Sequence, residues 1–129
     1  MGVDWTEKEH REIAEGIKKY DISSGKCAAL ARIVHRVAKA GARDARGVQL
    51  RCKKAVRFLV PRKPEIPCWG AHTYVETREY AVDVVTGPDG YKAASYVNDH
   101  WHWNDRFYEQ VEIDVATVDP GIEDIGDES

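Results

Sequence analysis

The sequence predicts an α+β domain in which N-terminal helices pack on an antiparallel sheet. Up to about residue 40, apolar residues recur with helical spacing, and from residue 47 they alternate with polar residues as in a strand. The chain has 129 residues, of which 43% are hydrophobic and 32% charged, enough for one core. We therefore expect a single domain over residues 1–118 and a frayed acidic tail over 119–129.

Two helices are predicted in the N-terminal part. Residues 4–20 carry a helical apolar stripe, with Asp4 as N-cap and Glu7 three positions later, as in a capping box. Turn-forming residues follow at 21–25. Residues 26–40 then place their apolar side chains on one face, and Gly41 is expected to end this helix.

Strands are predicted from residue 47 onwards, at 47–60, 71–76, 80–85 and 106–116. A proline-rich connection fills 61–67, a turn is expected at 86–90, and the aromatic stretch 91–103 is expected to be irregular.

If Thr77 and Arg78 form the tip of a hairpin, His72 lies directly opposite Asp83, with Cβ atoms about 4.5–5.5 Å apart. A carboxylate at that separation can orient an imidazole.

Cys27 is the candidate nucleophile that this histidine would serve. It opens the second predicted helix, where the helix dipole and free N–H groups stabilise a thiolate and can also stabilise an oxyanion. The alternative is that Cys27 is a small buried hydrophobic residue. Cys52 is expected in the core of a strand, and Cys68 is a rival nucleophile because it lies near His72 in the sequence.

Three short segments resemble the papain-like and transglutaminase-like superfamily. Ser24-Gly25-Lys26-Cys27 resembles its Gly-x-Cys helix start, His72-Thr73-Tyr74-Val75-Glu76 its histidine strand, and Tyr80-Ala81-Val82-Asp83 the acidic strand that follows. The resemblance spans residues 22–87 and extends to small papain-fold toxin domains of bacterial effectors. The chain departs from the pattern at Val84, where many transglutaminase-like members have proline, and it shows no certain upstream glutamine.

The resemblance implies a thiol-dependent acyl-transfer enzyme that acts on a protein or peptide-like amide without a cofactor or metal. Cys27 would be the nucleophile, His72 the general base and acid, and Asp83 the orienting residue. Protease, deamidase and transglutaminase remain open. Oxyanion or substrate contacts would fall to Ser24, Gly25, Trp69 and Trp101. The implied setting is the bacterial cytoplasm or delivery into a target cell, with an immunity protein as partner. The sequence offers neither a membrane-spanning run nor a signal peptide.

A non-catalytic binding module that retains only the fold is one alternative to the enzyme, and charge and histidine patterns suggest two more. Residues 1–67 hold 16 Lys and Arg against 8 Asp and Glu, whereas residues 68–129 hold 3 against 14. The basic span 26–63 could bind nucleic acid or form a metal-free nuclease, or the two halves could neutralise each other within one fold, the reading we favour. An exposed basic patch would contain Arg43, Arg46, Arg51, Lys53 and Lys54. A zinc site would draw on Cys68, His72, His100 and His102, but their spacing matches no compact finger.

Overall fold

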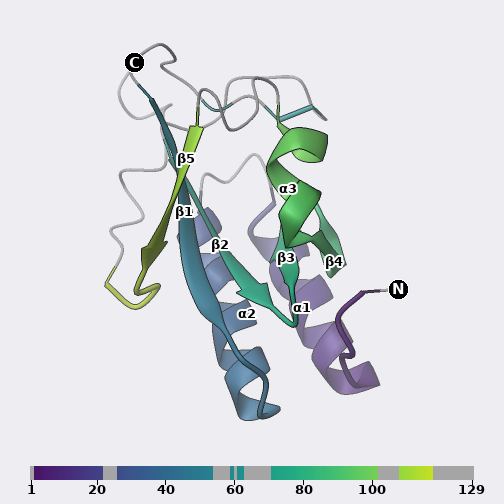
Figure 1. Cartoon of the computed structure of the whole chain (residues 1–129). Coiled ribbons are helices and arrows are strands. Elements are labelled where there is room, and N and C mark those ends of the chain that lie inside the picture. The colour runs from purple at the N-terminus through teal and green to yellow at the C-terminus, as the bar shows by residue number, and fades with distance from the viewer. Residues whose placement is uncertain are drawn as a thin grey trace.

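The computed structural model describes residues 2–21, 26–53, 59, 61–62, 71–101 and 108–117 (Figure 1). Within these ranges the chain forms three helices and a five-stranded antiparallel sheet, which confirms the α+β class. In chain order the elements are α1 (Glu7–Lys19), α2 (Cys27–Ala40), β1 (Arg46–Cys52), β2 (Ala71–Thr77), β3 (Tyr80–Asp83), β4 (Gly87–Lys92), α3 (Ala93–His100) and β5 (Tyr108–Ile113). The strand order is β4-β3-β2-β1-β5, so β5 returns to pair with the free side of β1.

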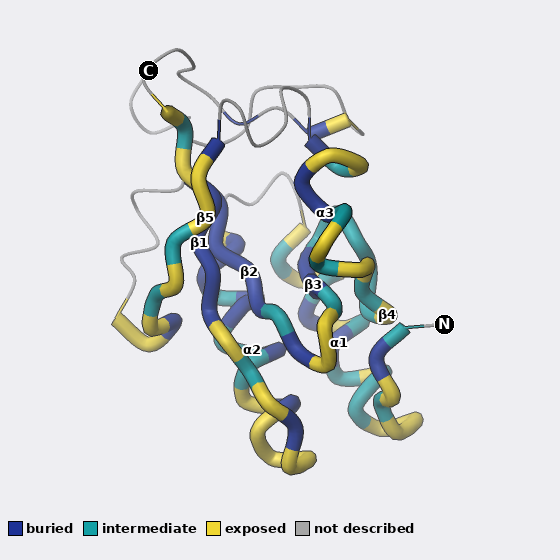
Figure 2. Tube along the Cα trace, viewed as in Figure 1, coloured by how far each residue is buried: buried dark blue, intermediate teal, exposed yellow. Residues whose placement is uncertain are grey.

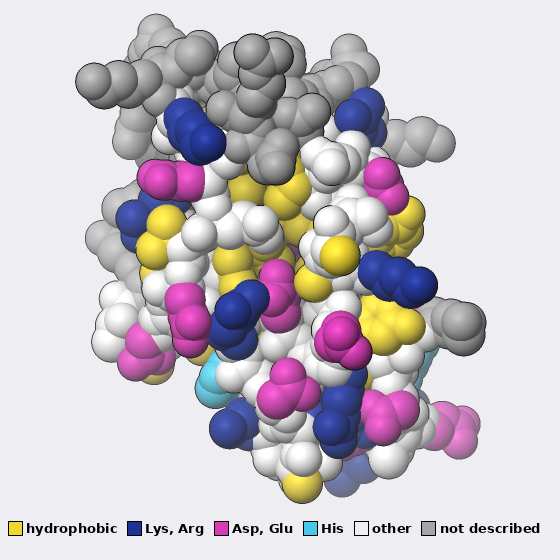
Figure 3. All heavy atoms as spheres, viewed as in Figure 1, with side chains coloured by type: hydrophobic (Ala, Val, Ile, Leu, Met, Phe, Trp, Pro, Cys, Tyr) yellow, Lys and Arg dark blue, Asp and Glu magenta, His cyan; other side chains and the backbone are white. Residues whose placement is uncertain are grey.

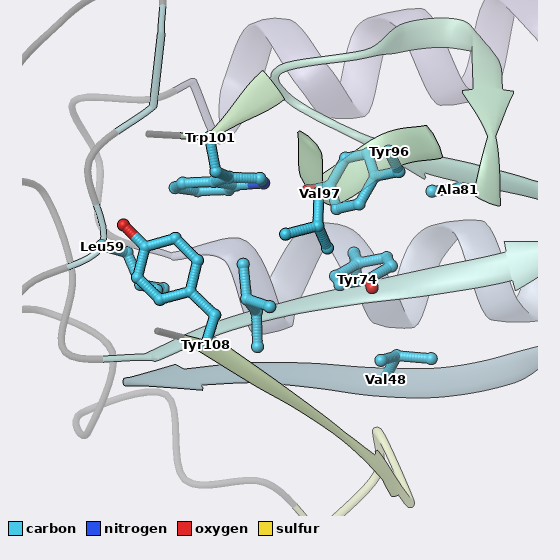
Figure 4. Packing of buried hydrophobic residues seen from close by; sticks show 9 residues of the cluster. Val48, Leu59, Tyr74, Ala81, Tyr96, Val97, Trp101 and Tyr108 are labelled. Carbon is cyan, nitrogen blue, oxygen red and sulfur yellow. The ribbon is translucent and has the colours of Figure 1, made fainter. Parts of the chain in front are cut away.

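Hydrophobic side chains cover both faces of the sheet. On one face, α1 and α2 pack against Val75 and Val82. On the other, Tyr96 and Val97 of α3 pack against Tyr74, together with Trp101 (Figure 4). Tyr74 and Val75 are neighbours in β2 and point to opposite faces, as the pleat of a strand requires. Burial from both sides makes β2 the most enclosed strand, as Figure 2 shows.

The N-cap of helix α1 lies two residues later than the sequence predicts. Thr6 is the N-cap: its hydroxyl accepts from the Glu9 N–H at 3.1 Å, and the Glu9 carboxylate accepts from the Thr6 N–H at 2.8 Å. The predicted cap at Asp4 is wrong because Arg43 holds the Asp4 carboxylate, with Nε at 2.9 Å. The capping-box chemistry was correctly expected, but a long-range ion pair moves it along the chain.

The path of the chain sets the N-terminus of α2 near the start of β2. Helix α2 covers Cys27–Ala40 and ends at Gly41, as predicted. Strand β1 then runs back along the helix, and β2 pairs antiparallel with β1, with Arg51 opposite Ala71. The start of β2 therefore lies at the end of the sheet where α2 begins. In the predicted strand 47–60, residues 54–58 and 60 lie outside the described residues.

The β2–β3 hairpin turns one residue later than predicted. Val75 pairs with Val82 and Thr77 with Tyr80, which leaves Arg78 and Glu79 at the tip. The expectation that His72 lies directly opposite Asp83 is therefore wrong. The two tip residues have φ of 52° and 69°, the left-handed conformations of a two-residue turn that matches the twist of the strands. The register differs by two residues, so every side chain stays on its expected face.

The chain after β3 differs most from the prediction. The turn falls at residues 84–86 instead of 86–90, so β3 ends at Asp83 and β4 begins at Gly87. Instead of an irregular stretch, residues 93–100 form α3, whose buried residues are Tyr96 and Val97. β5 lies within the predicted strand 106–116. Residues 63–70, 102–107 and 118–129, including the expected tail, lie outside the described residues.

The segment before α1 contacts the edge strand β4. The Val3 N–H donates to the Asp89 carbonyl at 2.9 Å, and the Trp5 indole N–H donates to the Pro88 carbonyl at 2.7 Å. Pro88 is compatible with β4 because an edge strand does not need every N–H for pairing.

Candidate functional site

Asp83 is the acceptor at the centre of a buried polar cluster. Its Oδ2 accepts from His72 Nε2 at 2.7 Å and from the Tyr96 hydroxyl. Its Oδ1 accepts from the backbone N–H groups of Val85, at 3.0 Å, and Thr86, at 2.9 Å. Each carboxylate oxygen thus receives two hydrogen bonds, and the predicted pairing of His72 with Asp83 is confirmed.

The turn after β3 orients this carboxylate. An aspartate at the end of a strand can accept from N–H groups two and three residues ahead and so form a local turn. Asp83 does this through Oδ1, while its own N–H donates to the Thr86 hydroxyl at 2.9 Å. Asp83 and Thr86 therefore fix each other, and Oδ2 is directed towards β2 and α3.

Aromatic rings surround the imidazole of His72. The Tyr74 ring stacks on it with centroids 5.8 Å apart, and the Trp101 ring lies 5.2 Å away, tilted by 50°. Figure 4 shows Tyr74, Tyr96 and Trp101 in one cluster between β2 and α3. The side chain of His72 has no exposed area, and that of Asp83 is 2% exposed. The pair therefore lies in the interior of the protein.

Electrostatics keep the Asp83 carboxyl group ionised. Burial raises the pKa of Asp83, but the hydrogen bond and charge of His72, with the donors Tyr96 and Thr86, outweigh burial and leave the pKa below its ordinary value. Burial, together with the Asp83 charge, raises the pKa of the Tyr96 hydroxyl well above its ordinary value. Asp83 is therefore an acceptor only, so both Tyr96 and His72 Nε2 carry the donated protons. A proton that His72 exchanges with a thiol must then pass through Nδ1.

Cys27 lies at the same end of the sheet as His72. It is the first residue of α2 and is buried, at 4% exposed. Helix α2 packs on the face that carries Val75, whereas the His72 ring packs with Tyr74 and Trp101 on the face that carries α3. Cys52 is half-buried in β1, and its burial raises the pKa of the thiol to about 11. Cys68 lies outside the described residues.

The remaining predicted site residues have different outcomes. Ser24, Gly25 and Trp69 lie outside the described residues. Trp101, expected to contact substrate, is fully buried and contacts the imidazole.

The sequence analysis did not predict Tyr96, whose hydroxyl donates to Asp83. The signal was present, because Ala93, Tyr96, Val97 and His100 follow the i, i+3, i+4, i+7 spacing of a helix.

The proposed basic patch is not built as expected, because Arg43 is buried. Its guanidinium contacts Asp4, at 2.9 Å, and Glu9, at 3.0 Å, and lies 4.8 Å from the Trp5 ring centre. Arg46 is ion-paired with Glu76. Basic and acidic side chains are interspersed over the face seen in Figure 3. Within the described residues, these pairs favour neutralisation of the two halves within the fold.

A zinc site gains no support from the described residues, where no three His, Cys, Asp or Glu side chains gather in a metal-binding group. His72 is bound to Asp83, and two other members of the predicted set, Cys68 and His102, lie outside the described residues.

The fold and the site together define a small α+β protein with a buried, carboxylate-oriented histidine. Comparison with known proteins finds no matching family model, no matching curated protein and no matching solved structure. Among the described helices, none combines the length and apolar character needed to cross a membrane.

Proposed function

We propose that this protein is a thiol-dependent acyl-transfer enzyme in which Cys27 is the nucleophile, His72 the general base and acid, and Asp83 the orienting residue. The observation that carries the proposal is the buried His72–Asp83 hydrogen bond of 2.7 Å. A carboxylate that fixes one nitrogen of an imidazole selects its tautomer and stabilises the imidazolium during proton transfer.

The energetic cost of this arrangement supports a functional role. Burying an ionisable pair removes hydration from both groups, and well-packed apolar residues of similar volume would often stabilise a core equally well or better. Asp83 needs two side-chain donors and two backbone N–H groups to remain an anion in the interior. A core with no chemical task could hold Leu or Val at these positions.

The position of Cys27 is the second supporting observation. A thiol in the first turn of a helix is activated by the helix dipole and by N–H groups that have no partner within the helix. The first turn of α2 contains no acidic residue that would oppose a thiolate. Cys52 offers a contrast, because burial raises the pKa of its thiol to about 11 and leaves it protonated at neutral pH.

The proposed reaction has two stages. Because α2 and the His72 ring lie on opposite faces of the sheet, the proposed contact between the thiol and the imidazole must lie at the end of the sheet where α2 and β2 begin. There the Cys27 thiol transfers its proton to His72 Nδ1 and Sγ bonds to the carbonyl carbon. The carbon–nitrogen bond of the amide then breaks as the imidazolium returns the proton to the leaving amine. His72 then takes a proton from water or an amine that attacks the thioester and returns it to Sγ. Asp83 remains an anion throughout.

Acylation by p-nitrophenyl acetate tests the proposal without knowledge of the natural substrate. We expect p-nitrophenolate release with a stoichiometric burst, and mass mapping that locates the acetyl group on Cys27. Cys27→Ala should abolish the burst and His72→Gln should slow it strongly. Cys52→Ala is the matched control and should behave like the wild-type chain. Acetylation of Cys68 or Cys52 with Cys27 unmodified would overturn the proposal.

A further inference from the structure

Two side chains donate to the same carboxylate oxygen. His72 Nε2 and the Tyr96 hydroxyl both bind Oδ2 of Asp83, whereas Oδ1 is occupied by the Val85 and Thr86 N–H groups of the turn. The turn therefore holds one side of the carboxylate, and Tyr96 is the donor that shares the other side with the imidazole.

The ring of Tyr96 is held by packing, so its hydroxyl has a fixed direction. Tyr96 is fully buried in α3. Its ring centroid lies 4.7 Å from that of Tyr74 and 5.4 Å from that of His100, and the Trp101 ring meets it edge-on at 6.5 Å. A donor fixed by its surroundings can stabilise a charge without a cost of reorganisation.

We propose that Tyr96 is a positioning residue of this site: its hydroxyl fixes Asp83 Oδ2 and keeps the carboxylate anionic beside His72. This role rests on the proposed function, because it acts on the reaction through Asp83 and His72. Tyr96 touches neither thiol nor substrate in the proposed chemistry.

The physical reason is that Asp83 lies in an apolar environment. Burial favours its neutral form, and a protonated Asp83 could not stabilise an imidazolium. The titratable groups that face it are His72 from β2 and Tyr96 from α3, with Tyr74 next to them, while the turn contributes only backbone N–H groups. The hydrogen bond from Tyr96 lowers the pKa of Asp83, so its loss should allow Asp83 to protonate at a higher pH.

Tyr96→Phe tests this role, with Tyr91→Phe as the matched control. The Tyr91 hydroxyl also donates to a carboxylate, Asp99 Oδ2 at 2.6 Å, but Tyr91 is exposed and lies outside the buried cluster. We expect Tyr96→Phe to slow Cys27 acetylation by roughly ten- to a hundredfold, the effect of one hydrogen bond to a charged group. The NMR signal of the Asp83 carboxyl carbon, followed downwards from pH 7, should begin to titrate at higher pH in this variant. In Tyr91→Phe both measurements should match the wild-type chain.

Two results would overturn the inference. One is an Asp83 titration that is the same in Tyr96→Phe and the wild-type chain, and the other is equal acetylation rates in the two phenylalanine variants. If Tyr96→Phe does not fold, the NMR spectrum of the wild-type protein tests the role. A Tyr96 hydroxyl proton bound to a carboxylate should exchange slowly with water and lie close to the protons of His72. The absence of this slowly exchanging hydroxyl signal would overturn the role. A wild-type chain that forms no thioester overturns the proposed function and the positioning role with it, whatever Asp83 does in the titration.

Discussion

His72 and Asp83 meet diagonally across the β2–β3 hairpin instead of directly opposite each other. Val75 pairs with Val82, so one further step of the same register would set Asp83 opposite Tyr74. The 2.7 Å contact is possible because Asp83 ends its strand and the following turn directs its carboxylate along β2. The site therefore depends on the turn at residues 84–86 as much as on the strands.

Replacing Asp83 with asparagine should impair both stability and activity. Each oxygen of Asp83 accepts from two donors. An asparagine amide has only one oxygen, so its NH₂ group would take the place of the other oxygen and would face two donors with no acceptor between them. We expect a loss of about 1–3 kcal/mol in the free energy of unfolding, measured with urea. Acetylation of Cys27 should fall by roughly two orders of magnitude or more.

Asp89→Asn is the control for that substitution, because its carboxylate is exposed and contacts only the exposed His10, at 3.2 Å, among the described ion pairs. Its unfolding free energy should change by less than about 0.5 kcal/mol. Equal effects of the two substitutions would contradict the role of Asp83 in the buried cluster.

The stability of the protein should decline on the acidic side. The folded-state pKa of Asp83 lies below the ordinary 3.8, since His72 and the other donors outweigh burial. A group with a depressed pKa contributes stability above its unfolded value and loses it as the pH falls towards the folded value. Urea unfolding should therefore show no contribution of Asp83 to the pH dependence between pH 5 and 7 and a decline below about pH 4. A decline that is identical in Asp83→Asn would contradict this assignment.

Arg43→Ala should destabilise the fold far more than Arg36→Ala. The Arg43 side chain is 6% exposed and links Asp4 and Glu9 to the end of α2, whereas the Arg36–Glu12 pair is open to solvent. We expect Arg43→Ala to lower the free energy of unfolding by about 2 kcal/mol and Arg36→Ala to lower it by less than about 1 kcal/mol. The loss for Arg43→Ala is no larger because its carboxylate partners can regain water. Thermal or urea unfolding of both variants measures the difference. Similar values would mean that Arg43 contributes no more than a surface ion pair.

Nucleic acid should bind weakly at physiological salt. Several arginines of the basic span contact groups of the same chain: Arg32 binds the Val115 carbonyl, Arg46 pairs with Glu76, and Arg62 binds the Asn98 carbonyl. Binding through phosphates needs free cations and falls steeply with salt. Mobility shifts of labelled RNA and DNA across a salt range measure this. Tight, salt-sensitive binding that persists in Cys27→Ala would favour the nucleic-acid alternative over acyl transfer.

The hairpin tip should accept glycine with a gain in stability. Glu79 has φ of 69°, a conformation that costs an L-residue about 1–2 kcal/mol and that glycine adopts freely. Glu79→Gly should therefore raise the free energy of unfolding, measured with urea, by up to about 1 kcal/mol. This figure allows for the greater entropy of glycine in the unfolded chain. Glu109→Gly, at an exposed position in strand β5, should lower it. A loss at both positions would argue against the left-handed turn.

Local patterns predicted most of the secondary structure. The apolar face of 26–40 and the glycine after it located α2 to within one residue, because these signals are contained in neighbouring positions. Strand alternation located β2 in the same way. The predictions failed where a distant residue decides the outcome: Arg43 occupies Asp4 and so moves the cap of α1, and no local pattern carries that information.

The candidate site was predicted only in part. Alternation placed His72 and Asp83 on one face of the sheet, and this survives a two-residue error in register. Tyr96 was not predicted because the many aromatic residues in 91–103 were interpreted as an irregular stretch instead of a short helix. Its contact with Asp83 also depends on how α3 crosses the sheet, which no local pattern specifies. The burial of Trp101 likewise depends on packing between segments far apart in the chain.

The hydrogen bonds from Val3 to Asp89 and from Trp5 to Pro88 also protect the edge strand β4 from self-association at high protein concentration. An uncovered edge strand offers its backbone groups to the edge of another molecule and promotes self-association. Removal of residues 2–5 would expose these two carbonyls of β4. Changes near this segment, including fusion of a purification tag, should therefore be checked by light scattering before any loss of activity is attributed to the site.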